Sequence, residues 1–120
     1  MNVNTKLLVD EYVGHCNGFE KHYRHWMGRY SYSEGVKFVA DTCECRWLID
    51  AIISHQNPKM IKACDGFQCW TLKKKDKGAV LTGGDGNRVL VTQNIEFTNF
   101  PIDEIEFYIE NTIIMLPEER

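Results

Sequence analysis

The sequence predicts an α+β fold in which N-terminal helices pack on one face of a four- to five-stranded antiparallel meander. In the first half, up to residue 57, apolar residues recur at helical spacing. From Gly66 onward the apolar period changes to two, as in half-buried strands, and turn-forming clusters separate the segments. Helices followed by a run of strands indicate α+β rather than alternating βαβ units. We expect the 120 residues to form a single domain, with a helical part at about 1–57 and a sheet part at about 66–117.

The helical half is predicted from caps, stops and apolar spacing. Asn17-Gly18 and Asn57-Pro58 are typical of the residues that end helices. The expected segments are a helix at about 6–16, a short helical turn at 19–26, a short strand at 30–32, a helical segment from Val36 to Ala40 and an amphipathic helix at about 45–55. The apolar face of the last helix is expected to consist of Trp47, Leu48, Ala51, Ile52 and His55.

The sheet half is predicted from alternation and from turn chemistry. The glycine-rich stretch 83–87 is the strongest hairpin signal, and the lysine-rich stretch 73–77 predicts a second turn. A phosphate-binding loop would stand between a strand and a helix, but a strand follows 83–87, so the hairpin is favoured. The predicted strands are 67–72, 79–82, 89–97, 105–109 and 113–116.

Charge and cysteine content narrow the classes of function. The formal net charge is -3, and free-standing nucleic-acid binding usually requires a basic surface. The chain has five cysteines, an odd number, and neither a signal-peptide pattern nor an apolar run of about 18 residues. We therefore expect a cytoplasmic protein with reduced thiols and no membrane association.

A metal site is one hypothesis for the polar residues between 22 and 52. His22, His25, Cys43 and Cys45 are residue types that zinc prefers, and four of them would close a tetrahedral site. The spacing argues against it, because zinc knuckles normally place two residues between their cysteines. The alternative is one buried thiol, one exposed thiol and two histidines with ordinary hydrogen bonds.

Acid–base catalysis is a second hypothesis for the same stretch. Histidine titrates near neutrality, and carboxylates can orient it or hold a metal ion. The candidates are His25, Asp41, Glu44 and Asp50, with Cys43 or Cys45 as a nucleophile. No two of the acids stand at a recognised metal-binding spacing, and such pairs are common on solvated helix faces.

A binding surface is the third hypothesis. Aromatic residues and arginine dominate interface hot spots, because each combines a large apolar area with a polar group. The same residue types can stack on a nucleotide. The alternative is that Tyr23 and Trp26, three residues apart, pack one helical face into the core. The candidate binding residues are Tyr23, Arg24, His25, Trp26, Arg29, Tyr32 and Asp41.

Several short stretches also carry a family resemblance. They are YRHW at 23–26, GV at 35–36, AD at 40–41, WLIDAI at 47–52 and FPIDEI at 100–105. Together they resemble a family of small uncharacterised proteins that recur in bacterial, plasmid and phage genomes, over about residues 19–116. Members of that family carry a small or aromatic residue where this chain has Cys43 and Cys45, which weakens the zinc hypothesis. The resemblance implies a mobile-element context, and it supplies neither an activity nor catalytic residues.

The leading functional hypothesis follows from that context. We expect a phage or plasmid accessory protein that binds a host protein stoichiometrically, for example an anti-defence inhibitor such as an anti-CRISPR protein, without a cofactor. An acidic face at 103–119 could imitate nucleic-acid charge toward a basic partner. A module that sequesters a small ligand or nucleotide is the first alternative, and a metal-dependent enzyme is the second. The edge strands of the sheet leave a homodimer open.

Overall fold

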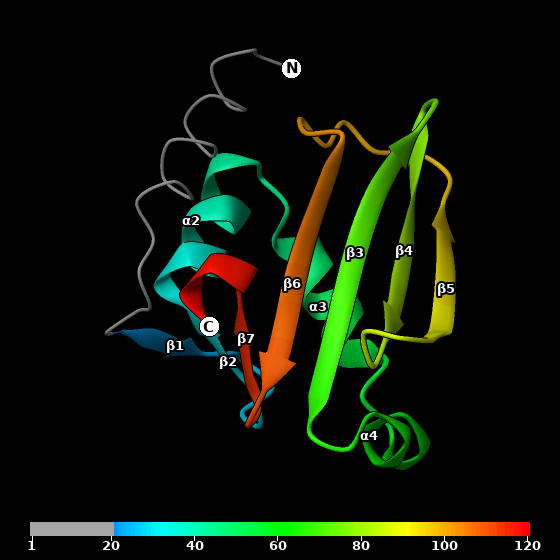
Figure 1. Cartoon of the computed structure of the whole chain (residues 1–120). Coiled ribbons are helices and arrows are strands. Elements are labelled where there is room, and N and C mark those ends of the chain that lie inside the picture. The colour runs from blue at the N-terminus through cyan, green and yellow to red at the C-terminus, as the bar shows by residue number, and fades with distance from the viewer. Residues whose placement is uncertain (1–20) are drawn as a thin grey trace.

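The computed structural model describes residues 21–120, so the helix expected at 6–16 lies outside the described residues. The described chain folds into two layers, a twisted sheet with helices behind it (Figure 1). The α+β class is confirmed. The elements are β1 (His22–Arg24), β2 (Ser31–Ser33), α2 (Glu34–Thr42), α3 (Arg46–Ser54), α4 (Pro58–Cys64), β3 (Phe67–Lys75), β4 (Gly78–Gly84), β5 (Val89–Ile95), β6 (Glu104–Glu110), β7 (Ile113–Met115) and the 3-10 turn η1 (Pro117–Glu119).

The sheet is larger than the predicted meander, and its strand order differs. Within residues 21–120 it has seven strands in the order β1-β2-β7-β6-β3-β4-β5. β3, β4 and β5 form the expected meander, but β6 crosses back to the free edge of β3. β7 returns on β6, and β2 lies parallel to β7. Alternation predicts where a strand is and which face it buries, but it does not specify the neighbouring strand.

The prediction of a helical turn at 19–26 is wrong for residues 22–24, which form β1. β1 pairs with β2 in an antiparallel hairpin, in which Tyr23 faces Tyr32. The His25 N–H donates to the Tyr30 carbonyl at 2.8 Å, and Gly28 takes the positive φ of +87° that the tight turn needs. Pairing across this turn overrides the weak helical pattern of the segment. The short strand expected at 30–32 is present as β2.

Two of the three described helices, α2 and α4, begin at a residue whose side chain caps them. Ser33 caps α2 by accepting the Val36 N–H at 3.1 Å. α2 ends at Thr42 with Cys43 as its C-cap, and the positive φ of the following Glu44 turns the chain into α3. Asn57 and Pro58 were expected to stop the helix before them, and α3 ends shortly before, at Ser54. The same two residues also start α4, since Asn57 accepts the Met60 N–H at 2.9 Å as an N-cap. This helix was not predicted.

The core lies between the sheet and helices α2 and α3. Trp70 and Leu72 of β3 and Phe107 of β6 point toward the helices and are fully buried. Gly83 of β4 lies under the Trp70 ring, where a Cβ would stand 2.5 Å from the ring atoms, so this glycine is a packing requirement rather than part of the turn. None of the helices in residues 21–120 has both the length and the apolarity that crossing a bilayer requires.

The buried face of α3 is rotated from the predicted one. Leu48 and Ile52 are buried as expected, but Ile49 and Ile53 are buried beside them. Trp47 and Ala51 are only half-buried at the border of the core. α3 has apolar residues on most of its circumference, so its sequence alone did not fix which side faces the sheet.

A buried carboxylate ties the end of the chain to the start of α2. Glu119 is 4% exposed and accepts the Ser33 hydroxyl at 2.5 Å and the Gly35 N–H at 3.1 Å. Its Oε1 also accepts the Leu116 N–H at 2.9 Å. A Cβ on Gly35 would stand 2.5 Å from the same oxygen, so glycine is needed for this approach. An anion at a helix N-terminus is also favoured by the helix dipole.

The β6–β7 turn contains a strained residue, which gives a first prediction. Asn111 and Thr112 both have positive φ, 55° and 63°, and a β-branched residue adopts this conformation at a cost. Thr112→Gly is expected to raise the free energy of unfolding by about 1 kcal/mol in urea denaturation. Thr71→Gly, in the regular strand β3, is the matched control and should lower it by a similar amount. Destabilisation by both changes would contradict the assignment of strain to Thr112.

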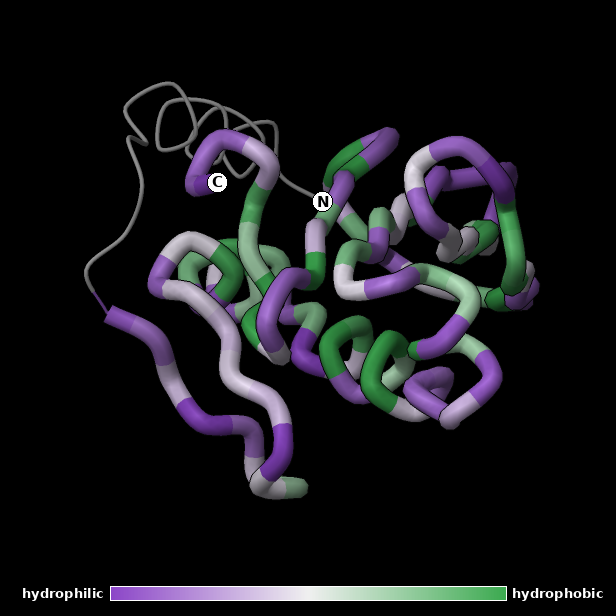
Figure 2. The backbone as a smooth tube through the Cα atoms, turned by 60° about the horizontal axis from the view of Figure 1, so that its bottom comes forward, coloured by the Kyte–Doolittle hydropathy of each residue, from purple (hydrophilic) through white to green (hydrophobic). Residues whose placement is uncertain are grey.

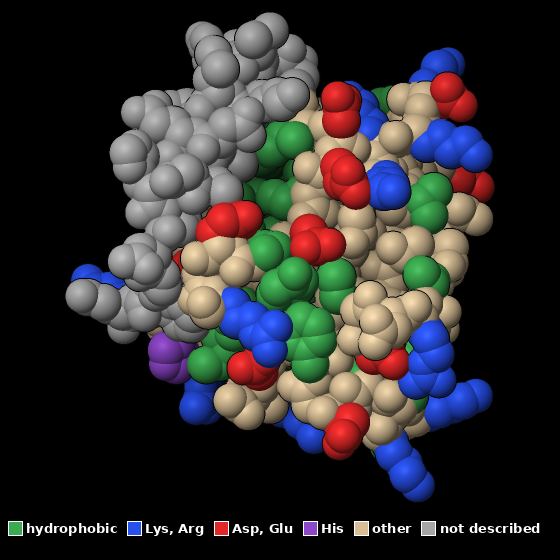
Figure 3. Space-filling view, viewed as in Figure 1, with side chains coloured by type: hydrophobic (Ala, Val, Ile, Leu, Met, Phe, Trp, Pro, Cys, Tyr) green, Lys and Arg blue, Asp and Glu red, His purple; other side chains and the backbone are tan. Residues whose placement is uncertain are grey.

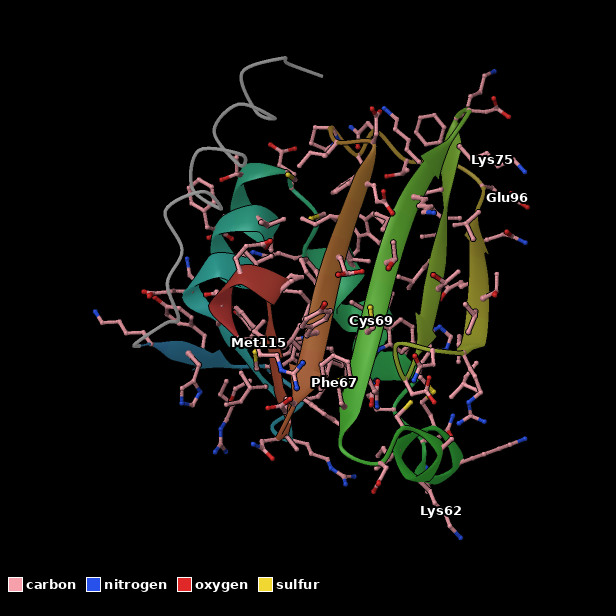
Figure 4. All side chains as sticks on the ribbon, viewed as in Figure 1. Lys62, Phe67, Cys69, Lys75, Glu96 and Met115 are labelled. Atoms are coloured by element: carbon pink, nitrogen blue, oxygen red, sulfur yellow. The ribbon has the colours of Figure 1, made fainter. Side chains whose placement is uncertain are left out.

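The sheet face turned away from the helices is partly exposed to solvent. It carries charged side chains of both signs around a small apolar centre (Figure 3). Phe67 and Tyr108 meet edge to face at 4.9 Å, and Arg120 covers the Phe67 ring at 4.5 Å while pairing with Glu110. Cys69 lies on the same face as Phe67 (Figure 4), and burial and the neighbouring Glu106 raise the pKa of its thiol to about 11.

Candidate functional site

The β1–β2 hairpin and the outer side of α3 enclose the candidate site. The hairpin projects from the rest of the described chain and is largely hydrophilic (Figure 2). It stands at one end of the sheet, since β1 is the edge strand and all three of its residues are exposed. Helix α3 supplies the facing wall through Arg46, Ile49 and Asp50. The site is therefore formed by segments that are separated in sequence by the whole of α2.

His25 anchors the hairpin to α3. Its side chain is 4% exposed, and Nε2 lies 2.6 Å from Oδ1 of Asp50. Nδ1 accepts the Met27 N–H at 3.2 Å, so the proton of the neutral ring is on Nε2 and is donated to Asp50. Both ring nitrogens are used within the protein. The arrangement positions the hairpin and leaves no free imidazole nitrogen for proton transfer to a substrate.

Trp26 is exposed and yet held in place. Its side chain is 78% exposed, the largest value among the exposed large apolar residues of residues 21–120. The indole N–H donates to the same Oδ1 of Asp50 at 3.2 Å, and the ring lies 5.3 Å from the His25 ring. Asp50 thus fixes both neighbouring side chains. An apolar ring that is ordered before binding loses little conformational entropy when a partner covers it.

A pocket of about 400 Å³ lies beside Trp26. Arg24 lines it and is exposed, with no hydrogen bond or ion pair to any residue of the described chain. Tyr32 also lines it and stacks on Tyr23 at 5.9 Å between ring centres. Two arginines, two aromatic rings and one carboxylate converge in this space. The lining residues are Arg24, His25, Trp26, Tyr32, Arg46, Ile49 and Asp50.

Asp41 organises the cations next to the pocket. Its Oδ2 accepts from Lys37 at 2.7 Å, and its Oδ1 accepts two bonds from Arg46 at 2.8 and 3.1 Å. The hydrogen bond from Lys37, together with that from Arg46, lowers the pKa of the Asp41 carboxyl. Arg46 also lines a second hollow of about 520 Å³ with Glu44 and Trp47, so the two hollows adjoin at Arg46. Asp41 acts by orienting Arg46 rather than by lining the first pocket.

The proposed zinc ligands do not assemble. In residues 21–120 no three His, Cys, Asp or Glu side chains come together as metal ligands. Cys43 and Cys45 flank Glu44 at the α2–α3 corner, where both are buried. The Cys45 thiol donates to the Val39 carbonyl at 3.7 Å. Its contact with Cys43 lowers the pKa of the Cys43 thiol, while the same contact and burial raise the pKa of Cys45. The two thiols pack against each other, and His22 and His25 lie in the hairpin.

Most of the predicted binding residues lie together. Arg24, His25, Trp26 and Tyr32 line the pocket, Tyr23 stacks on Tyr32, and Asp41 holds Arg46. Arg29 lies in the hairpin turn outside the pocket lining. The alternative in which Tyr23 and Trp26 pack into the core is wrong, because both are exposed.

Two lining residues, Arg46 and Ile49, were missed by the sequence analysis. With Asp50 they stand at positions i, i+3 and i+4 of α3, which is the spacing of one helix face. The helix was interpreted as a core element, and its second face was not considered. An arginine and an aspartate on one side of an otherwise apolar helix are the signal that could have found this wall.

The exposed large apolar residues fall into two groups. Tyr23, Trp26 and Met27 lie on the hairpin, and the other group consists of Val89, Leu90 and Phe97 at β5 and just after it. The two groups are at opposite ends of the sheet, since β1 and β5 are its two edges. Grouped apolar residues on a surface mark sites of interaction more often than scattered ones do.

Comparison with known proteins gives a family and no activity. A family model described as "Family of unknown function (DUF6876)" matches residues 8–120. No curated protein and no solved structure shows significant similarity to the chain.

Proposed function

The chain belongs to DUF6876, a family of unknown function, and from the hairpin surface we propose that it acts by stoichiometric binding to another protein. The observation that carries the proposal is Trp26, which is 78% exposed while its indole N–H is fixed by Asp50. Tyr23 and Met27 extend the apolar area on the same hairpin, and Arg24 adds a cation that has no ion pair within residues 21–120. Trp, Tyr and Arg are the residues in which binding energy concentrates at protein interfaces.

The chemistry of the pocket favours binding over catalysis. A general base needs a nitrogen or oxygen that can accept a proton from a substrate, and both nitrogens of His25 are occupied. Two of the expected carboxylates are also bonded within the protein, Asp41 to Lys37 and Arg46 and Asp50 to His25 and Trp26. These contacts hold the polar side chains in fixed positions and leave none of them ready to transfer a proton to a substrate, which favours a binding surface.

The proposed partner is a protein of a host cell, for example a component of an antiviral defence system. This part of the proposal rests on the sequence resemblance to proteins of phage and plasmid genomes. The acidic face expected at 103–119 does not contribute to it. Glu119 is buried and so does not face a partner. Glu110 pairs with Arg120 and Glu104 lies 3.7 Å from Lys73, so the negative charge of both is compensated by a cation of the same chain. The partner is therefore expected to meet the hairpin.

Site-specific crosslinking tests the proposal. A photoreactive residue at Met27 is expected to capture one protein repeatedly in host cells, whereas the same residue at Phe97, on the other apolar group, should not capture it. The captured protein, once purified, should bind the chain in a fixed molar ratio in calorimetry. Conversion of a nucleotide or nucleic acid by substoichiometric chain would refute the binding proposal, and so would equal capture at both positions.

A small anionic ligand such as a nucleotide is the second candidate. The observation that favours it is the convergence of Arg24 and Arg46 on Tyr32 around a space of about 400 Å³. A nucleotide present at about 100 times its dissociation constant would add roughly 2.7 kcal/mol to the free energy of unfolding. We expect the corresponding rise in melting temperature to disappear in Arg24→Ala and to persist in Arg29→Ala, which lies outside the pocket. The absence of a rise across a nucleotide panel would remove this candidate.

A further inference from the structure

The second group of exposed apolar residues surrounds the edge strand β5. Val89 is 67% exposed and Leu90 is exposed beside it at the start of the strand, and Phe97, 75% exposed, follows its end. β5 closes the sheet on this side, with β4 as its neighbour. An edge strand presents a row of backbone N–H and C=O groups that can pair with another strand.

The two edges of the sheet are protected very differently. β1 has three residues, two of which are His22 and Arg24, and short charged strands discourage pairing. β5 has seven residues, Val89–Ile95, with no charged residue, no proline and no glycine. The sequence of β5 therefore lacks the features with which proteins usually block an edge.

The irregular part of β5 is confined to its start. The register against β4 shifts between Gly83 and Gly84, opposite Leu90, and continues regularly from Val91 to Ile95. Val91 and Ile95 are half-buried on the helix side of the sheet, whereas Thr92 and Asn94 are exposed. Five consecutive regular residues are enough for a two-stranded contact of ordinary length.

We infer that two copies of this chain pair through β5, in an antiparallel contact about a two-fold axis centred on Gln93. A two-fold axis brings each surface against itself, so a charged edge would face its own charge. β5 has no charged residue, so this repulsion is absent. Val91 would lie opposite the partner's Ile95, and such a pair of β-branched residues stabilises neighbouring strands. Thr92 would lie opposite the partner's Asn94. The pairing joins two seven-stranded sheets into one continuous sheet.

The hairpin surface stays free in this dimer. β1 and β5 are the opposite edges of the sheet, so a contact at β5 leaves Trp26 and the pocket accessible on both copies. The inference does not depend on the proposed function. Trp26→Ala should leave the dimer intact, and loss of the dimer should leave the hairpin surface of each copy unchanged.

Charge pairs on β5 test the contact. Native mass spectrometry and light scattering of the untagged protein are expected to show twice the chain mass of 14.0 kDa. Thr92→Lys with Asn94→Lys should weaken the dimer about 100-fold, because lysines then face lysines across the two-fold axis. Thr92→Glu with Asn94→Glu should do the same. Mixing the two variants should restore a one-to-one heterodimer, and far-UV circular dichroism should show that both variants keep their fold.

Three outcomes would overturn the inference. The first is a wild-type protein that is monomeric at about 100 µM. The second is a dimer that survives in both charged variants, which would place the contact elsewhere. The third is a pair of charged variants that are folded and monomeric but fail to form the heterodimer when mixed.

Discussion

Glu119→Ala is expected to lower the free energy of unfolding by roughly 3 kcal/mol, because three buried donors lose their acceptor together. The donors are the Ser33 hydroxyl and the backbone N–H groups of Gly35 and Leu116. Two of them belong to the start of α2 and the third to the segment after β7, so the change also separates two parts of the fold. The melting temperature should fall by roughly 10 °C in a chain of this size.

Two further variants make this expectation specific. Glu119→Gln keeps the shape but turns an amide N–H₂ toward one of the donors, and we expect a cost of about 2 kcal/mol. Glu118→Ala, at the exposed neighbouring position, should change the free energy of unfolding by less than about 0.5 kcal/mol. Urea denaturation followed by circular dichroism measures all three. Equal effects at the two positions would show that the carboxylate does not tie the segments together.

Trp26→Ala is expected to weaken binding of the partner by about 30-fold or more, which corresponds to about 2 kcal/mol. The ring is exposed, so its removal should change the free energy of unfolding by less than about 0.5 kcal/mol. A large loss of affinity without a loss of stability separates a contact residue from a structural one. Calorimetry with the captured partner measures the affinity, and urea denaturation measures the stability.

The chain supplies a matched control for this change. Phe97 is 75% exposed, close to the 78% of Trp26, and lies at the opposite edge of the sheet. Phe97→Ala should bind the partner with wild-type affinity. Trp26→Phe keeps an aromatic ring but loses the bond to Asp50, and we expect an intermediate affinity. An equal loss in Trp26→Ala and Phe97→Ala would mean that exposed apolar area matters and that the hairpin does not.

The parts of the fold that were predicted correctly are those set by local chemistry. The hairpin at 83–87, the lysine-rich turn and the five strands after Gly66 follow from alternation and turn residues, which act over a few positions. The return of β6 to β3 and the parallel pairing of β2 with β7 depend on contacts between distant segments. No local pattern in β2, a strand of three residues, indicates its neighbour.

The candidate site was predicted on one side only. Residue types led to Arg24, His25, Trp26 and Tyr32, because aromatic and arginine side chains gather there in sequence. The wall formed by α3 was missed, since its polar residues are spaced along a helix that is otherwise apolar. The pairing of His25 with Asp50 joins residues that are 25 positions apart and required the three-dimensional structure.

The parallel pairing of β2 with β7 has a consequence for how the chain folds. Ser31 lies beside Ile113, so the hairpin that carries Trp26 reaches its place in the sheet only when the last strand has formed. Contacts between such distant positions raise the contact order and slow folding. During synthesis, the hairpin would remain without its sheet neighbour until the β7 residues, about 80 positions later, had left the ribosome. A partner that recognises the assembled site would therefore select molecules in which β7 has already paired with β2.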